Sequence, residues 1–130
     1  MPHGFDMPIL VVDDYPTMIR ILSNLLKQIG YTNIEEAANG AEAYEKAQAK
    51  EYGLVISDWN MHPMTGYELL QKLRADPRTQ ATPFIMVTAE SKTDNVIAAR
   101  KAGVSGYIVK PFNAQTLKAK IDAVFAARAA

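Results

Sequence analysis

Cysteine is absent from this chain of 130 residues, and charge of one sign is not in excess, because 14 lysines and arginines balance 14 acidic residues. Without cysteine there can be no disulfide and no thiolate metal site. Without a basic excess, the balance does not indicate a nucleic-acid binder. No apolar stretch approaches the ~20 residues that span a bilayer, and the segment 1–8 lacks the basic start and apolar centre of a signal peptide. We therefore expect a cytoplasmic protein that does not enter membranes.

Linkers, repeats and low-complexity segments are also absent, and 48% hydrophobic content is enough for the core of one domain. We expect a single domain over residues 1–130, with its ordered part at about 7–127. Within it, strand-like and helix-like segments alternate five times. This alternation is typical of an α/β fold with a parallel sheet and right-handed crossovers.

Four of the five strand-like segments are continuous apolar runs, which are typical of parallel strands covered on both faces. The second segment is polar and suits an edge of the sheet. The expected strands are Ile9–Asp13, Asn33–Ala37, Leu54–Asp58, Phe84–Val87 and Tyr107–Val109.

Start and stop signals mark the helices. Pro16 suits a first helical turn, where its missing N–H costs nothing, and Gly30 suits the end of that helix. Asn113 is a candidate N-cap. In the first helix, apolar residues at helical spacing predict the buried face as Met18, Ile21, Leu22, Leu25 and Ile29. The helices are expected from Asp14 or Tyr15 to Gly30, from Gly40 towards Lys50, after Thr65 and Gly66 to before Asp76 and Pro77, over about Thr93–Ala102, and after Asn113.

Polar side chains stand where four of the strands end. Asp13 and Asp14 follow the first strand, Asp58 ends the third, and Thr88 and Lys110 follow the fourth and fifth. Ligands bind at this edge of an open parallel sheet. Three carboxylates brought together repel one another unless a cation lies between them, and Mg²⁺ prefers such oxygen ligands. The hydroxyl and the ammonium group beside that cation suit a phosphate.

The same residue types can carry phosphoryl transfer. An aspartate can act as a nucleophile and form an aspartyl phosphate, while Thr88 and Lys110 bind the phosphoryl oxygens. The backbone carbonyl of Asn60 can add a metal ligand. A lone aspartate at a strand end is more often a turn or cap residue, but the adjacent Asp13 and Asp14 directly after an apolar strand are harder to explain in that way.

Six motifs surround these positions: Val11–Asp14, Ala38–Gly40, Ile56–Met61, Met64–Gly66, Val87–Glu90 and Gly106–Phe112. They resemble the receiver domain of two-component response regulators, and within that family the single-domain chemotaxis (CheY-like) type. The resemblance covers nearly the whole chain. It implies a flavodoxin-like, doubly wound sheet of five parallel strands in the order 2-1-3-4-5, with five helices.

The resemblance also implies roles for the site residues. Asp58 would accept a phosphoryl group from a phosphohistidine of a sensor histidine kinase. Mg²⁺ would be held by the carboxylates of Asp13, Asp14 and Asp58 and by the carbonyl of Asn60.

The remaining implied roles concern binding and switching. Thr88 and Lys110 would bind the phosphoryl oxygens and report the arrival of the group. Tyr107 would be the switch aromatic, turning inward when Thr88 is drawn to the phosphoryl group. The peptide bond between Lys110 and Pro111 would be cis, which is a rare feature.

The implied function is that of a stand-alone signalling protein rather than an enzyme, although it catalyses its own phosphotransfer and autodephosphorylation. Phosphorylation would alter the surface of the fourth helix, fifth strand and fifth helix. A separate partner would bind that surface, and the chemotaxis type makes this partner a flagellar motor switch protein. A phosphatase is a further candidate partner, and the protein is expected to be a monomer.

Three alternatives stay open. The protein could be a phosphorelay intermediate or phosphate sink, or a receiver-like binding module, although the complete acidic set argues against the latter. A Mg²⁺-dependent phosphatase would need a second aspartate two residues after Asp58, where Asn60 stands. His62 occupies a position where the family usually has proline, and is either a titrating group near the site or a solvent-facing loop residue. His3 lies far from it in sequence, so a histidine metal site is not expected.

Overall fold

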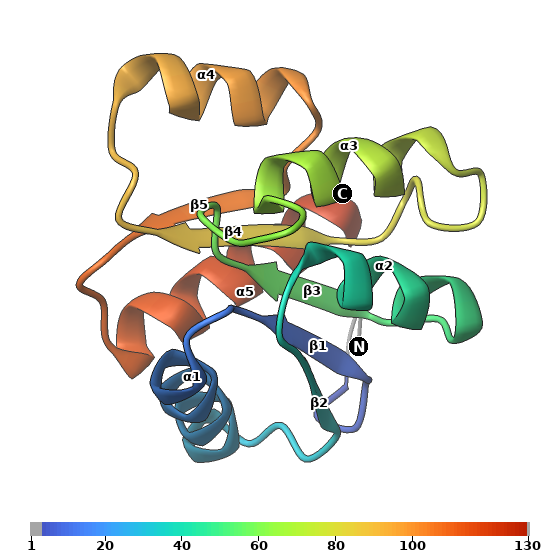
Figure 1. Ribbon diagram of the computed structural model, residues 1–130. Helices are drawn as coiled ribbons and strands as arrows, with labels where there is room; N and C mark the ends of the chain where they lie inside the picture. The colour runs from blue at the N-terminus through green and yellow to red at the C-terminus, as the bar shows by residue number, and fades with distance from the viewer. Residues whose placement is uncertain (1–3, 130) are drawn as a thin grey trace.

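The computed structural model describes residues 4–129 as a five-stranded parallel sheet with helices on both faces (Figure 1). The strands lie in the order β2-β1-β3-β4-β5, which confirms the predicted flavodoxin-like topology. His3 lies outside the described residues. The elements are β1 (Ile9–Val12), α1 (Pro16–Ile29), β2 (Ile34–Ala37), α2 (Gly40–Ala49), β3 (Leu54–Ser57), α3 (Gly66–Ala75), β4 (Phe84–Thr88), α4 (Thr93–Lys101), β5 (Gly106–Val109) and α5 (Ala114–Ala129).

Two apolar layers fill the space between the sheet and the helices. Helices α1 and α5 cover one face, and α2, α3 and α4 lie on the other (Figure 1). Alternate residues of a strand point to opposite faces, so Val11 of β1 packs in the layer of α1 and α5 while Leu10 packs in that of α2 and α3. Every residue of β1, β3 and β4 is buried, which explains why these strands are uninterrupted apolar runs. The polar strand β2 lies at the edge, as predicted.

The predicted helix signals are found at their expected places. Pro16 begins α1, and Gly30 follows its end with a φ of 128°, a conformation that other residues rarely adopt. The Asn113 side chain accepts a hydrogen bond from the Thr116 N–H at 2.8 Å, which confirms it as a cap of α5. Among residues 4–129, no helix is both long and apolar enough to cross a membrane.

The buried face of α1 differs from the prediction. The helix buries Ile19, Leu22, Ser23 and Leu26, whereas Ile21 is 43% exposed. Apolar residues cover so much of this helix that their spacing could not locate the centre of the buried face. The prediction for Ile21 was therefore wrong, although Leu22 was placed correctly.

Candidate functional site

Strand register brings two of the predicted carboxylates to neighbouring positions. Val12 of β1 is paired with Ser57 of β3. An aspartate follows each of them in the chain, Asp13 after Val12 and Asp58 after Ser57. The Asp58 N–H still donates to the Val12 carbonyl at 3.1 Å. Both side chains therefore leave the sheet at its carboxyl edge, where the prediction placed them.

Lys110 reaches the same point from the far edge of the sheet. Its N–H donates to the carbonyl of Thr88 at 2.9 Å, which continues the pairing of β4 with β5. Its Nζ lies 3.6 Å from Asp13 Oδ2 and 3.8 Å from Asp58 Oδ2. One ammonium group therefore lies close to both carboxylates and offsets part of their mutual repulsion.

The two carboxylates have different environments. The side chain of Asp13 is 2% exposed and that of Asp58 is 12% exposed. Asp13 Oδ1 accepts the Tyr15 N–H at 3.0 Å, but Asp13 Oδ2 is buried without a hydrogen-bond donor among the described residues. Asp58 Oδ1 accepts the Trp59 N–H at 2.7 Å. A small molecule in solvent can thus reach the carboxylate of Asp58 more readily than that of Asp13.

Burial is the main cause that raises the pKa of Asp13 above its ordinary value of 3.8. The negative charges of Asp58 and Asp14 raise it further, while the Tyr15 N–H and the Lys110 ammonium lower it in part. The ionised form of Asp13 is therefore costly in this arrangement. A second cation near Asp13 Oδ2 would relieve that cost.

The other expected metal ligands are less enclosed. Asp14 and Asn60 are both exposed. Within residues 4–129, no three acidic or histidine side chains converge closely enough to hold an ion by themselves. A cation at this edge would therefore need the backbone carbonyl of the loop after β3, or oxygens from a ligand, in addition to the carboxylates.

Glu90 links Thr88 to Tyr107 through hydrogen bonds of its backbone. Thr88 is fully buried, and its hydroxyl oxygen accepts the Glu90 N–H at 3.3 Å. The Tyr107 hydroxyl donates to the Glu90 carbonyl at 2.6 Å. Burial raises the pKa of Tyr107, and the charges of Glu90 and Asp58 add to the effect. The ring is half-buried against the layer that contains α2 and α3.

Glu90 has a part in the site that sequence reasoning did not assign. Its carboxylate accepts from Asn60 Nδ2 at 3.1 Å and from Asn95 Nδ2 at 3.0 Å. It thus connects the loop after β3 with helix α4. The only signal in the sequence was its place two residues after Thr88, in a motif already quoted for the family resemblance.

Two loops near the site each contain a cis peptide bond before a proline. The Lys110–Pro111 peptide is cis, which confirms the expectation, and the His62–Pro63 peptide is cis as well. His62 is exposed, which agrees with a solvent-facing loop residue.

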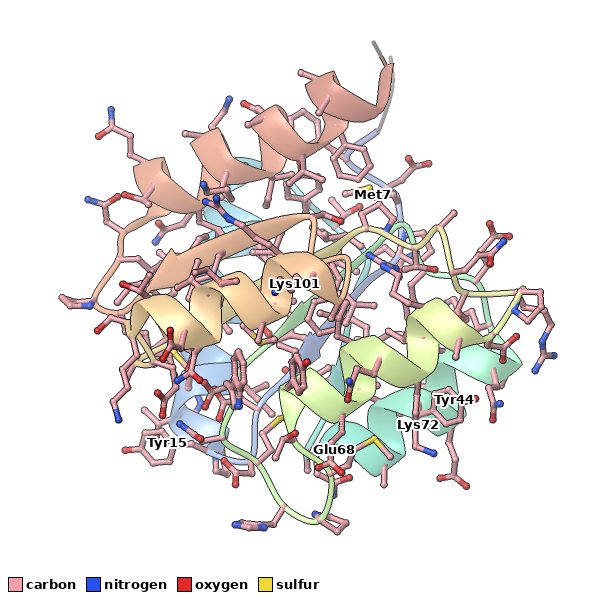
Figure 2. All side chains as sticks on the ribbon, turned by 90° about the horizontal axis from the view of Figure 1, so that it is seen from above. Met7, Tyr15, Tyr44, Glu68, Lys72 and Lys101 are labelled. Carbon is pink, nitrogen blue, oxygen red and sulfur yellow. The ribbon has the colours of Figure 1, made fainter. Side chains whose placement is uncertain are left out.

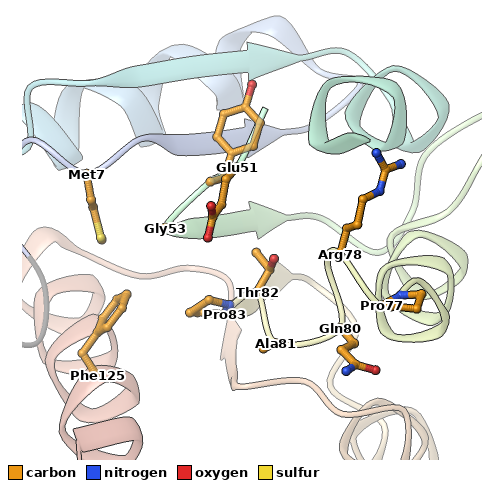
Figure 3. A pocket seen from close by; sticks show the side chains of 11 residues that line it. Met7, Glu51, Gly53, Pro77, Arg78, Gln80, Ala81, Thr82, Pro83 and Phe125 are labelled. Atoms are coloured by element: carbon orange, nitrogen blue, oxygen red, sulfur yellow. The ribbon is translucent and has the colours of Figure 1, made fainter. Parts of the chain in front are cut away.

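A separate cleft of about 350 Å³ lies at the opposite, amino edge of the sheet (Figure 3). It lies beside the segments that lead into β1, β3 and β4, and none of the predicted site residues lines it. The cleft is therefore separate from the polar cluster at the carboxyl edge. The cleft is lined by Met7, Glu51, Tyr52, Gly53, Pro77, Arg78, Gln80, Ala81, Thr82, Pro83 and Phe125.

Comparison with known proteins agrees with this geometry. Residues 9–122 match the response regulator receiver domain. A chemotaxis protein CheY from Pseudomonas aeruginosa is 50% identical over 119 residues, which cover 92% of this chain and 96% of that protein. The structure of chemotaxis protein CheY4 from Vibrio cholerae is similar with a TM-score of 0.85 and 35% identity, over 92% of this chain and 98% of that one.

A third similarity concerns the fold alone. The receiver domain of a Pseudomonas aeruginosa sensor histidine kinase, with a magnesium ion coordinated in its active site cleft, has a TM-score of 0.84 and 24% identity over 93% of this chain and 98% of that one. Together, the motifs, the sheet order and the relatives show that the chain belongs to the response regulator receiver family, the phospho-accepting signalling proteins of two-component systems, and that it is of the chemotaxis CheY type.

Proposed function

We propose that Asp58 is the residue that accepts the phosphoryl group. The observation that carries this proposal is the position of Lys110 Nζ near two carboxylates, 3.6 Å from Asp13 Oδ2 and 3.8 Å from Asp58 Oδ2. Of these two carboxylates, that of Asp58 has the greater access to solvent. An incoming phosphoryl group would therefore meet Asp58 with a fixed positive charge beside it.

The transfer is an exchange of one bond for another. An oxygen of the Asp58 carboxylate attacks the phosphorus of a phosphohistidine, an O–P bond forms, and the P–N bond breaks. The electron pair of that bond remains on the imidazole nitrogen, which takes up a proton. The Lys110 ammonium and the Thr88 hydroxyl bind phosphoryl oxygens, where fixed donors stabilise the charge of the transition state.

The residues at this edge fit Mg²⁺. The carboxylates of Asp13, Asp14 and Asp58 and the carbonyl of Asn60 are the hard oxygen ligands that the ion prefers, and the unsatisfied Asp13 Oδ2 is a place for a cation. Bound Mg²⁺ supplies charge neutralisation during transfer of the phosphoryl group. Asp13, Asp14 and the Asn60 carbonyl would hold the ion together with Asp58, whose other carboxylate oxygen remains able to react.

The signal leaves the site through Thr88. A phosphoryl group on Asp58 would accept a hydrogen bond from the Thr88 hydroxyl and draw that hydroxyl away from the Glu90 N–H, and Glu90 also holds Tyr107. A change at Thr88 thereby affects the loop that connects β4 with α4. Ligand-dependent changes of such a bistable element are a general way to pass a signal.

The output face comprises the exposed residues of α4, β5 and α5, which lie together at one edge of the sheet (Figure 1). Ile97 and Val109 are large apolar side chains that are 44% and 41% exposed. Lys101 is exposed on α4 (Figure 2), one helical turn after Ile97. This composition suits a partner segment that has acidic residues and an apolar anchor. We infer that the partner is a flagellar motor switch protein, that the donor is a sensor histidine kinase, and that the protein acts as a cytoplasmic monomer.

The test is labelling by a small phosphodonor. Acetyl phosphate with Mg²⁺ should add one phosphoryl group to the wild type, seen by intact-mass analysis, and Asp58→Asn should not react. Asp6→Asn is the matched control, because it makes the same chemical change at an exposed aspartate before β1. Equal labelling of Asp58→Asn and the wild type would refute the assignment.

A further inference from the structure

The carboxylate of Asp58 is held in one orientation by the residue that follows it. Asp58 Oδ1 accepts the Trp59 N–H at 2.7 Å, while Asp58 Oδ2 is the oxygen near Lys110. The direction of this N–H is set by the peptide plane between Asp58 and Trp59. A movement of that plane would therefore change the orientation of the carboxylate relative to Lys110.

Helix α3 contacts the backbone on both sides of Trp59. The Gly66 N–H donates to the Trp59 carbonyl at 2.8 Å. A Cβ at position 66 would lie 1.9 Å from the Asp58 carbonyl oxygen, so only glycine permits this close approach. The Ser57 hydroxyl donates to that same carbonyl at 2.9 Å. The carbonyl of the peptide link between Asp58 and Trp59 and the carbonyl of the next link are thus both held by hydrogen bonds.

The next residue of α3 holds the side chain of Trp59. The rings of Trp59 and Tyr67 are stacked, with 5.0 Å between their centroids and 5° between their planes. Both residues are half-buried, and Trp59 also packs against the layer under α2 and α3. Stacked aromatic pairs contribute specific geometry in addition to buried area. Trp59 is therefore fixed by its ring as well as by its carbonyl.

We propose that Tyr67 is a positioning residue for phosphotransfer, which acts through Trp59 on the orientation of the Asp58 carboxylate. This inference rests on the proposed role of Asp58 as acceptor. Tyr67 does not itself touch the reacting atoms. Its ring prevents Trp59 from rotating, and Trp59 in turn keeps its N–H directed at Asp58 Oδ1. Small errors in the placement of a reacting group can lower rates substantially.

The experiment measures the initial rate of phosphorylation by acetyl phosphate at saturating Mg²⁺. Tyr67→Ala should slow it by about 3- to 10-fold, because the carboxylate spends less time in the reactive orientation. Tyr67→Phe keeps a flat ring and should stay within about twofold of the wild type. Tyr44→Ala is the matched control, since this half-buried tyrosine on α2 has its ring against Lys72 of α3, 5.4 Å from the ammonium, and its loss should also leave the rate within about twofold (Figure 2).

A second readout reports on the stack itself. Trp59 is the sole tryptophan, so quenching of intrinsic fluorescence by acrylamide measures the access of solvent to its ring. Tyr67→Ala should increase quenching and Tyr67→Phe should not. Should Tyr67→Ala fail to fold, Tyr67→Leu supplies an apolar side chain without a flat ring and decides the question in the same two assays.

The outcomes separate this inference from the function on which it rests. A wild type that is not labelled at Asp58 would remove the proposed function. Labelling of the wild type with an unchanged rate in Tyr67→Ala would overturn the inference alone. An equal loss of rate in Tyr67→Ala and Tyr44→Ala would also overturn it, because general loosening of α2 and α3 would then explain the effect.

Discussion

Replacing Asp13 by asparagine should stabilise the metal-free protein. Asp13 is 2% exposed, its Oδ2 has no hydrogen-bond donor among residues 4–129, and burial raises its pKa above 3.8. Asparagine keeps an oxygen that can accept the Tyr15 N–H, but it removes the buried charge and its repulsion from Asp58. The change has almost no effect on side-chain volume.

The size of the gain follows from the cost of keeping Asp13 ionised in the fold. Leaving a buried polar group without its hydrogen bond costs about 1–3 kcal/mol, and loss of the attraction to Lys110 offsets part of the gain. We expect a net gain of about 1 kcal/mol at pH 7, or a rise of roughly 3–5 °C in the melting temperature. Lys110 retains Asp58 as a partner, 3.8 Å away.

The gain should depend on pH in a defined direction. Because the folded protein binds the Asp13 proton more tightly than the unfolded chain does, its stability falls as pH rises from 3.8 through the raised pKa of the folded state. The advantage of Asp13→Asn should thus be complete at pH 7 and shrink towards pH 4. The measurement is thermal unfolding in chelator across this range, with Asp6→Asn as the control.

Mg²⁺ should stabilise the wild type more than it stabilises Asp13→Asn. The ion binds only the folded state and stabilises it by mass action, and Asp13→Asn lacks a ligand for it. Millimolar Mg²⁺ should raise the melting temperature of the wild type more than that of Asp13→Asn. A wild type whose melting temperature does not respond to Mg²⁺, or a variant less stable than the wild type in chelator, would refute the role assigned to Asp13.

Two further predictions test the coupling and the close packing of the site. Thr88→Ala should shrink the ratio of partner affinities with and without phosphorylation, which is typically about 5–150-fold for coupled sites; titration of the output partner, corrected for the phosphorylated fraction, measures the ratio, and an unchanged value would exclude Thr88 from the signal path. Gly66→Ala should lower the free energy of unfolding by about 2 kcal/mol or more, since its Cβ would lie 1.9 Å from the Asp58 carbonyl oxygen. Gly106→Ala, whose Cβ would meet the flexible Lys120 side chain at 3.1 Å, should cost much less in the same urea titration.

The fold could be predicted because its signals are local and agree with one another. Buried parallel strands need continuous apolar runs, and β1, β3 and β4 have them. Pro16 and Asn113 mark helix starts through the chemistry of their own backbone or side chain. The order of the strands, by contrast, came from the family resemblance, because the apolar runs alone do not say which strands are neighbours.

The site could be predicted only as a set of residues at one edge. The rule that parallel strands end together placed Asp13, Asp58 and Lys110 correctly, but it could not say that the ammonium group would lie near both carboxylates. The link through Glu90 and the stack on Tyr67 were missed. Both depend on loop conformations that are set by contacts between segments far apart in the sequence.

Asp13 illustrates a conflict between stability and function. A buried carboxylate oxygen without a hydrogen-bond donor is costly to the fold, and asparagine at this position would remove that cost. An aspartate here is therefore poorly explained by stability. It is well explained by a cation that neutralises it and by a reaction that needs that cation. Groups that burden the native state and gain a further partner when a ligand arrives are expected at functional sites. The unsatisfied Asp13 Oδ2 thus supports the proposed function independently of family resemblance.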